Sequence, residues 1–185
     1  MLSVVQQEEE YFDLVDTNNN LLGKSKLRKD VHRDGDWHRA IHLWIQNSNG
    51  DLLLQKRSKE KKLFPNLWHM AVAGHVEHPT SLDCVQTCIK EAKEELGIDL
   101  VEQQLTFLFT LKWKYSANGI NDAEFDYIYL AKLNLPIEQV SYSSDEVSDV
   151  KYFSIDEFIK QISTNPEIFL PQLDEYRKLI KILQS

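Results

Sequence analysis

The alternation of apolar and polar positions predicts several strands along this chain. In the apolar segment that contains Trp44, Ile41 and Leu43 fall on one face of a predicted strand, and His42 and Trp44 fall on the other. This period of two is typical of a half-buried strand, which shows one face to a core and the other to a different environment. We therefore expect a strand at 38–46.

Turn residues separate the other predicted strands. Further strands are predicted at 11–15, 51–57, 69–73, 105–115, 123–133 and 147–153. The Asn-Ser-Asn-Gly segment at 47–50 favours a tight turn, so 38–46 and 51–57 form a predicted hairpin. Residues 21–36 and 59–67 show no clear period, so we expect an irregular basic extension and a loop there.

Residues 82–96 show the helical period instead. The apolar positions that share one face of this helix are Leu82, Val85, Ile89, Ala92 and Leu96. Gly97 follows, and glycine is typical of a helix C-cap. At the other end, Thr80 or Ser81 is predicted to cap the helix, and Asp83 is placed to complete a capping box from Thr80.

Two more helices are predicted towards the end of the sequence. Ser154 is a typical N-cap residue for a helix that begins at the next position. Pro171 precedes an amphipathic segment that carries Leu179 and Leu183 on one face. Strands on both sides of one helix, followed by helices, predict the α/β class with a mixed β-sheet between helices.

The central helix also carries a cluster of acidic residues. Glu91, Glu94 and Glu95 lie roughly opposite its apolar face and close to its C-terminal end, where negative charge opposes the helix dipole. Their mutual repulsion at helical spacing is unfavourable, and carboxylate oxygens are the ligands that Mg²⁺ and Mn²⁺ prefer. A solvated acidic surface is the alternative interpretation, but these features together favour a metal site.

Composition places the chain among single-domain globular proteins. Its 185 residues form one domain by length, and its 21 basic against 29 acidic residues give a net charge of −8, which argues against general nucleic-acid binding. We see neither a secretory segment nor an apolar run long enough to span a bilayer, so we expect a cytoplasmic protein. Cys84 and Cys88 lie one helical turn apart and are expected to stay reduced.

The acidic helix resembles a known family motif. Lys90 to Ile98 is similar to the second half of the Nudix box, REUxEExGU with U aliphatic, with lysine in place of the arginine and Ala92 in place of the first aliphatic residue. The first half departs from the motif, because counting from Gly74 puts Thr80 at the early glutamate position, and the spacing to Lys90 is two residues longer than in the family. These departures change the expected surroundings of the predicted metal site, because lysine lacks the planar fork of arginine.

The Nudix resemblance implies an α/β/α sandwich with a mixed β-sheet between helices. We accordingly expect one Nudix-like domain over 1–185, with an N-terminal extension at about 1–36 and C-terminal helices at about 154–184. The family acts on a diphosphate joined to a group X, so a metal-dependent pyrophosphohydrolase acting on acid anhydrides is the expected enzyme. The expected partner is a small-molecule diphosphate, and a homodimer is among the assemblies that the resemblance leaves open.

Outside the motif, the chain looks like the branch of the family that resembles isopentenyl diphosphate isomerase. The likeness lies in the segments 32–40, 54–58, 73–75 and 121–124. In the isomerase the matching residues form a metal site, which implies metal ligands at His32, His38, His75, Asp122 and Glu124. For the histidines, a solvated surface position is the alternative.

One position separates isomerase from hydrolase chemistry. The isomerase uses a cysteine as acid-base group just before its glycine-histidine pair, and Ala73 occupies that position here. Since a methyl group cannot transfer a proton, we favour hydrolysis of a nucleoside diphosphate derivative or other small organic diphosphate. The isomerase reaction is the alternative, and a non-catalytic diphosphate-binding module is a third, motivated by the departures in the motif.

The resemblance also implies roles for individual residues. Glu91, Glu94 and Glu95 are expected to hold Mg²⁺ or Mn²⁺, and the expected catalytic residues are Glu94, Glu95 and Glu124. Gly74 allows a close approach of the backbone. The basic residues expected to meet phosphate oxygens are Lys56, Arg57, Lys61 and Lys62, with a solvated charge run as the alternative.

The identity of the group X is not encoded in any motif of the sequence. Five rings lie on predicted strands and could stack on a base or cover a prenyl chain: His42, Trp44, Trp113, Tyr127 and Tyr129. Aromatic side chains on strands more often belong to a core, so each of these positions has two interpretations.

Overall fold

A computed structural model describes residues 9–79 and 83–185. Its strands are β1 (Tyr11–Val15), β2 (Leu21–Leu27), β3 (His38–Gln46), β4 (Leu52–Arg57), β5 (Trp68–Met70), β6 (Val72–His75), β7 (Leu105–Ala117), β8 (Ile120–Lys132) and β9 (Val147–Phe153). Its α-helices are α1 (Arg28–Asp34), α2 (Cys84–Leu96), α3 (Ile155–Thr164) and α4 (Leu173–Leu183). Within these described ranges, no helix is long and apolar enough to cross a membrane.

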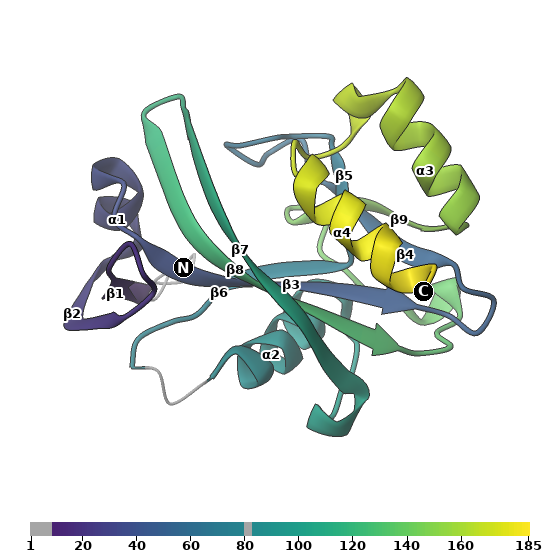
Figure 1. Cartoon of the computed structure of the whole chain (residues 1–185), viewed down its shortest axis with the longest axis horizontal. Helices are drawn as coiled ribbons and strands as arrows, with labels where there is room; N and C mark the ends of the chain where they lie inside the picture. Colours follow the sequence, from purple (N-terminus) through teal and green to yellow (C-terminus); the bar gives the residue numbers. More distant parts are fainter. Residues whose placement is uncertain (1–8, 80–82) are drawn as a thin grey trace, which may run out of the picture.

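The strands form a small and a large sheet (Figure 1). β1 and β2 pair as an antiparallel hairpin. The large sheet has the order β5-β4-β3-β8-β7, and β9 pairs with β4. β6 pairs with residues 40–43 of β3, whereas β4 pairs with residues 45–46 of that strand. β3 is antiparallel to β4 and β6 but parallel to β8, so the sheet is mixed.

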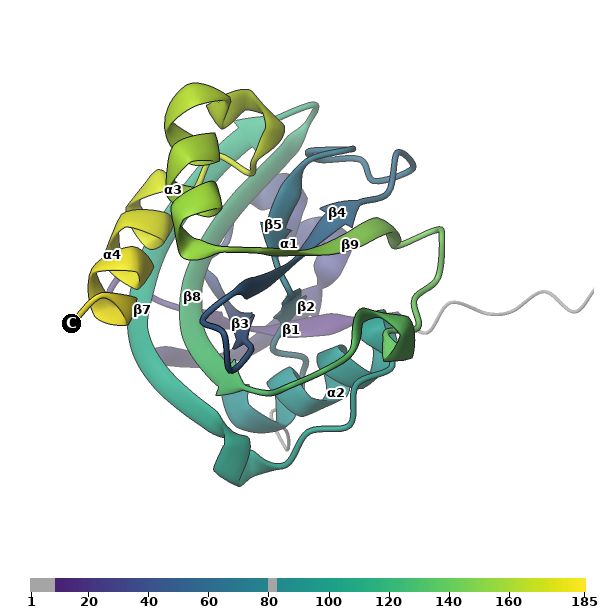
Figure 2. The same cartoon turned by 90° about the vertical axis from the view of Figure 1, so that its right-hand side faces the viewer.

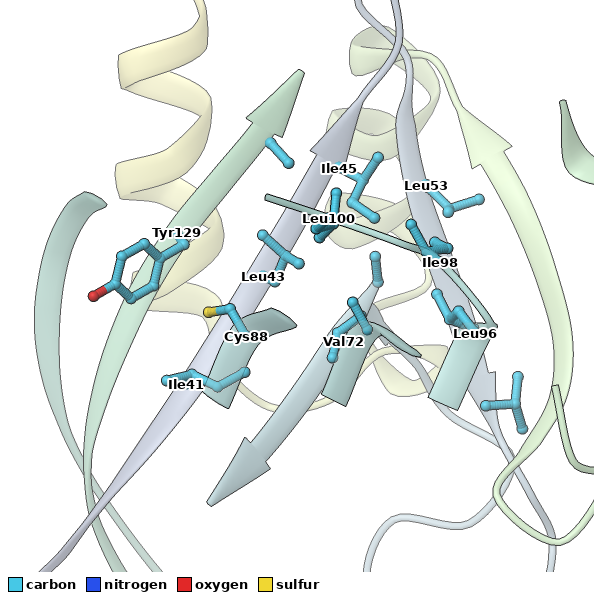
Figure 3. Packing of buried hydrophobic residues seen from close by; sticks show 14 of the residues in the cluster. Ile41, Leu43, Ile45, Leu53, Val72, Cys88, Leu96, Ile98, Leu100 and Tyr129 are labelled. Atoms are coloured by element: carbon cyan, nitrogen blue, oxygen red, sulfur yellow. The ribbon is translucent and has the colours of Figure 1, made fainter. Parts of the chain in front are cut away.

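Helices cover both faces of the large sheet (Figure 2). α2 packs on one face over a core that includes Ile41, Leu43 and Cys88, and these side chains meet between sheet and helix (Figure 3). α3 and α4 pack on the opposite face over a second core around Trp44 and Phe158. The predicted α/β class, with a mixed sheet between helices, is confirmed.

Helix α2 has well-defined ends. Gly97 adopts a left-handed conformation with φ of 67°, as predicted for the C-cap, and glycine accepts this conformation without steric cost. At the start, the N-cap is Asp83, whose carboxylate accepts a hydrogen bond from the backbone N–H of Gln86. The predicted caps Thr80 and Ser81 lie outside the described residues. Among the described residues, Asp83 is the N-cap of this helix.

Two predictions about local structure were wrong. Residues 21–36 are not irregular, since they form strand β2 and helix α1. Most of β2 is exposed, including Leu21 and Leu22, so no hydrophobic alternation marks it in the sequence. The predicted strand at 69–73 is divided into β5 and β6, and Gly74 accordingly lies within a strand and not in a loop.

A buried carboxylate fastens α4 to the sheet. Glu175 is 1% exposed and accepts hydrogen bonds from Trp44 Nε1 at 2.7 Å and from His42 Nδ1 at 2.8 Å. Burial alone would lower the pKa of His42, but Glu175 and Asp126 outweigh it and raise this pKa to about 10. A charged pair therefore links β3 to α4 inside the protein.

Removing this carboxylate is expected to destabilise the fold. In Glu175→Ala the buried Trp44 and His42 lose their partner, and loss of one partner of a buried ion pair typically costs about 3 kcal/mol or more. Urea denaturation followed by tryptophan fluorescence measures this change. Asp174→Ala is the matched control, because the Asp174 side chain is 86% exposed. Equal stability of the two variants would contradict the structural role of Glu175.

Candidate functional site

A cavity of about 1060 Å³ opens where β6, α2, the start of β8 and the loop at 58–67 meet. It brings together residues that are far apart in the sequence. The predicted site residues that line it are His32, Arg57, Lys61, Lys62, Gly74, His75, Glu91, Glu94, Glu95, Asp122 and Glu124. Its volume slightly exceeds the range of about 300–1,000 Å³ that is typical of pockets for small organic ligands.

Three histidines gather beside one end of this cavity, and two of them, His32 and His75, line it. His38 begins β3 and lies beside Glu124 in the parallel register of β8. His75 ends β6, and His32 comes from α1. Their ring centroids lie 5.2–5.3 Å apart in all three pairs. The ring of Phe12 stacks on His38 and His75, so packing fixes the orientation of the imidazoles.

The arrangement of polar atoms fits a divalent metal ion. One ligand atom from each of His32, His38, His75 and Asp122 lies within 4.8 Å of the others. In the described part of the chain, the Nε2 atoms of the three histidines and Oδ1 of Asp122 are buried without a hydrogen-bond partner. Unpaired buried polar atoms are costly, and a cation with nitrogen and oxygen ligands would satisfy them.

Glu124 completes this cluster. Its Oε1 lies 3.0 Å from Nε2 of His75 and 3.5 Å from Nε2 of His38. His38 is oriented from the other side, because its Nδ1 lies 3.0 Å from the carbonyl oxygen of Asp36. A hydrogen bond from Nδ1 leaves Nε2 free to accept a metal, as is usual for histidine ligands.

The pKa values of His32, His75 and Glu124 also fit metal binding. Burial lowers the pKa of His32 to about 3 and that of His75 to about 4, so both imidazoles are neutral at pH 7 and can act as ligands. Burial would raise the pKa of Glu124, but its contacts with His38 and His75 lower it well below its usual value. Burial and the nearby Glu124 raise the pKa of Asp122 to about 7.

The carboxylates of α2 line the opposite side of β6. Glu91 packs directly on Gly74, where an added Cβ would lie 2.4 Å from the Cγ and Cδ atoms of Glu91. Glu95 accepts a hydrogen bond from Gln55 Nε2 at 2.8 Å. Glu94 is the most exposed of the three. The acidic face is therefore not a uniform solvated surface, because the sheet covers part of it.

Two of these carboxyl groups lie in a buried setting that disfavours their charged form. Burial and repulsion from Glu95 raise the pKa of Glu91 to about 8, and burial raises the pKa of Glu95 to about 7. Lys90 neutralises other groups, since its Nζ lies 2.7 Å from Glu77 and 3.7 Å from Glu94. A bound divalent cation would stabilise the ionised form of Glu91 and Glu95.

The predicted basic residues divide into two groups. Lys61 and Lys62 line the cavity, and Lys61 forms an ion pair with Glu146. Arg57 also borders the cavity, but its guanidinium donates to the carbonyl oxygen of Leu63 at 3.1 Å and so fixes the loop at 58–67. Lys56 is not among the lining residues, because its Nζ lies over the ring of Trp68, 5.9 Å from the centroid.

The structure adds cavity residues that the sequence did not single out. Glu77, His69 and Gln172 line the cavity. His69 is flanked by apolar strand residues and Gln172 precedes the last helix, so neither lies in a motif. Only Glu77, three residues after Gly74, lies near enough to the motif for sequence reasoning to have considered it.

The aromatic candidates and the cysteines have different surroundings. Trp44 and Tyr129 are core residues, 0% and 7% exposed, and Tyr127 packs against the α2 core. Trp113 and His42 line the cavity. Cys84 and Cys88 are both free and belong to or pack against the α2 core, and burial raises the pKa of each thiol.

Comparison with known proteins gives a consistent family assignment. The profile of the NUDIX domain matches residues 36–173. Nudix hydrolase 3 of Arabidopsis thaliana is 36% identical over 96% of this chain, which spans 24% of that protein's length. An isopentenyl-diphosphate Delta-isomerase of Pectobacterium atrosepticum is 32% identical over 84% of this chain and 83% of its own.

A solved structure supports the fold alone. The crystal structure of a Deinococcus radiodurans protein superposes with a TM-score of 0.69, covering 95% of this chain and 100% of that chain at 22% identity. At that identity the likeness concerns the backbone arrangement, so roles of single side chains rest on the geometry described above.

Replacing Gly74 is expected to disturb Glu91 directly. In Gly74→Ala the new methyl group would overlap the Glu91 side chain, and overpacking of this kind typically costs about 1–3 kcal/mol. The double variant with Glu91→Ala removes the overlapping atoms, so it should recover most of that loss. Thermal and urea unfolding of the single and double variants measure the coupling. Additive effects in this cycle would contradict the direct contact.

The raised pKa values of Glu91 and Glu95 predict a pH dependence of stability. Both values lie above the ordinary 4.5, so the folded protein keeps protons that the unfolded chain has lost, and stability falls as pH rises through about 7 and 8. His32 and His75 act in the opposite direction, but only below their ordinary 6.5.

Urea denaturation in EDTA, from about pH 6.5 to about pH 8.5, covers the range in which Glu91 ionises in the folded protein. His42 and Asp122, whose pKa values are also raised, lower the stability in the same direction, so the comparison with Glu91→Gln separates the contribution of Glu91. The free energy of unfolding should decrease over this range, and Glu91→Gln should reduce the slope because its side chain cannot ionise. Glu94→Gln is the control, because this side chain is 57% exposed. A slope that Glu91→Gln leaves unchanged would show that Glu91 is not held protonated.

Proposed function

Because the chain belongs to the Nudix family, we propose that it is a metal-dependent hydrolase that cleaves a diphosphate linkage in a nucleoside diphosphate derivative or another small organic diphosphate. The family match confirms the predicted family, and the hydrolase relatives support the predicted class, a pyrophosphohydrolase that acts on acid anhydrides. One observation carries the proposal: a single cavity is lined by helix carboxylates, by a His/Asp/Glu cluster and by lysines.

The metal-binding residues form two groups in this proposal. Glu91, Glu94 and Glu95 hold Mg²⁺ or Mn²⁺, because hard carboxylate oxygens suit these ions. The second group is the cluster of His32, His38, His75, Asp122 and Glu124, with its nitrogen-rich donor set. A bound divalent cation supplies charge stabilisation on the diphosphate oxygens and lowers the pKa of an attacking water.

Among the proposed catalytic carboxylates, Glu95 is best suited to take a proton if Glu91 and Glu94 bind the cation more closely, because direct contact with the cation would lower the pKa of Glu95. Burial raises its pKa to about 7, and a general base works best when its pKa is near the working pH. Glu124 is less suited, because His38 and His75 keep its pKa low, which favours a role as metal ligand.

Positive charge and backbone shape position the diphosphate. Lys62 and Lys61 border the cavity and would bind phosphate oxygens as ammonium donors. Arg57 acts indirectly by holding the loop that carries both lysines. Gly74 carries no side chain, which lets Glu91 pack directly against strand β6 at the cavity wall.

Isomerisation of isopentenyl diphosphate is the second candidate. The histidine cluster and the similarity to an isopentenyl-diphosphate Delta-isomerase favour it. Against it, Ala73 lies in register with His42 on β3 and borders the cavity with a methyl group. No proton can be transferred from that position, so hydrolysis is the better-supported reaction.

The test is a panel of diphosphate compounds assayed for release of phosphate or a monophosphate with Mg²⁺ or Mn²⁺. The wild type should turn over at least one compound. Glu94→Gln and Glu95→Gln should each lower kcat, by about 100-fold for Glu95→Gln, as loss of a base typically does. Glu102→Gln, an exposed residue just after α2, is the matched control and should leave turnover unchanged.

Three results would contradict parts of this proposal. Unchanged turnover in both glutamate variants would show that the assigned metal role is wrong. Wild-type interconversion of isopentenyl and dimethylallyl diphosphate would overturn the preference for hydrolysis, and Ala73→Cys tests whether that chemistry can be introduced. Binding of a diphosphate and metal by calorimetry without any product would identify a non-catalytic binding module.

A further inference from the structure

A single phenyl ring touches all three imidazoles of the histidine cluster. Phe12 on β1 is 0% exposed, and its ring stacks on His75 and His38, with 4.6 Å and 5.2 Å between the ring centroids. It meets the ring of His32 edge-on at 5.8 Å. A phenyl ring has no nitrogen, oxygen or sulfur ligand atom to offer a cation, so Phe12 can act on a bound ion only through the histidines.

Hydrogen bonding leaves two of these imidazoles without the support that metal ligands usually have. Nδ1 of His38 lies 3.0 Å from the carbonyl oxygen of Asp36, whereas among the described residues Nδ1 of His32 and Nδ1 of His75 have no hydrogen-bond partner. A histidine ligand usually donates its second ring N–H to a carbonyl or carboxylate group, which fixes the orientation of the ring. Contact with Phe12 takes the place of that hydrogen bond for His32 and His75.

Phe12 and His32 belong to a segment that precedes the family match. The match begins at residue 36, while Phe12 lies on β1 and His32 on α1. Strand β1 is fastened to the matched domain, because the backbone N–H of His78 donates to the carbonyl oxygen of Tyr11 at 2.7 Å. The preceding segment therefore reaches the histidine cluster with one possible ligand and one orienting ring.

We propose that Phe12 is a positioning residue that holds His32, His38 and His75 ready for a divalent cation, so that docking of the β1–β2 hairpin and metal binding favour each other. This inference rests on the second metal-binding group of the proposed function. Rings that are already held in place lose little freedom when the cation binds. Such coupling is reciprocal, since a docked hairpin that raises the affinity for the cation is itself stabilised by the cation by the same factor.

Titration with Co²⁺, followed by visible absorption, is the first test. Absorption bands that are lost in His75→Ala belong to the histidine cluster, which separates this cluster from the carboxylates of α2. Phe12→Leu keeps a buried apolar side chain but removes the ring. The Kd for Co²⁺ measured from these bands should rise about tenfold or more in this variant, as is typical when a group that orients metal ligands is removed. An unchanged Kd would overturn the inference.

Phe158→Leu is the matched control. Phe158 is also 0% exposed, but its ring packs on Trp44 and Tyr176 in the core beneath α3 and α4. Both variants should lower the free energy of unfolding, because each loses buried ring contacts. Only Phe12→Leu should weaken the binding of Co²⁺. An equal rise of Kd in the two variants would show a general packing defect and contradict a positioning role.

Hydrogen exchange of the wild type tests the coupling from the other side and does not depend on the folding of a variant. Co²⁺ should slow the exchange of the amides that join β1 to the domain, those of Val15 and His78, which donate to Trp37 and Tyr11. The amide of Phe158, which donates to Ser154 at the start of α3, is the internal control and should change less. Equal changes at all three amides would contradict the coupling.

Failure of this inference and failure of the proposed metal group give different results. If the wild type shows no Co²⁺ bands that depend on His75, the second metal-binding group of the proposed function is wrong, and the positioning role falls with it. If these bands are present but neither Phe12→Leu nor hydrogen exchange shows the expected change, the metal group stands and only the role of Phe12 is overturned.

Discussion

The pleat of strand β6 is the constraint on which the candidate site depends. Neighbouring residues of a strand point to opposite faces, so Gly74 turns its bare Cα towards Glu91 of α2 while His75 turns towards Glu124. The antiparallel register with β3 fixes this assignment, since Gly74 pairs with Ile41 of the α2 core face. Strand β6 thus separates the α2 carboxylates from the His/Asp/Glu cluster, and residues of both groups border the same cavity.

Buried titratable side chains with shifted pKa values are common to both groups of predicted metal ligands. The pKa values of Glu91 and Asp122 are raised mainly by burial, while those of His32 and His75 are lowered by it. Such shifts store unfavourable electrostatic energy that a divalent cation would relieve, and their concentration in one cavity is typical of functional sites. The proposed hydrolysis draws on this same arrangement of ligands, base and ammonium groups.

On the opposite face of the sheet, one set of contacts both stabilises the core and positions a residue of the cavity wall. Glu175 satisfies Trp44 and His42 and thereby docks α4 against β3, which brings Gln172 to the cavity. The segment just before the last helix is therefore part of the cavity wall, while the helix itself packs on the core.

The sequence by itself determined the strands with clear alternation, the helix ended by Gly97 and the residue types that bind metal, because these depend on local periodicity and chemistry. It failed for β2, whose exposed residues leave no hydrophobic signal. Only the tertiary structure decided that Lys56 lies on Trp68 instead of in the cavity, and that Gln172 reaches it. Such contacts arise from the packing of distant elements, which no local pattern records.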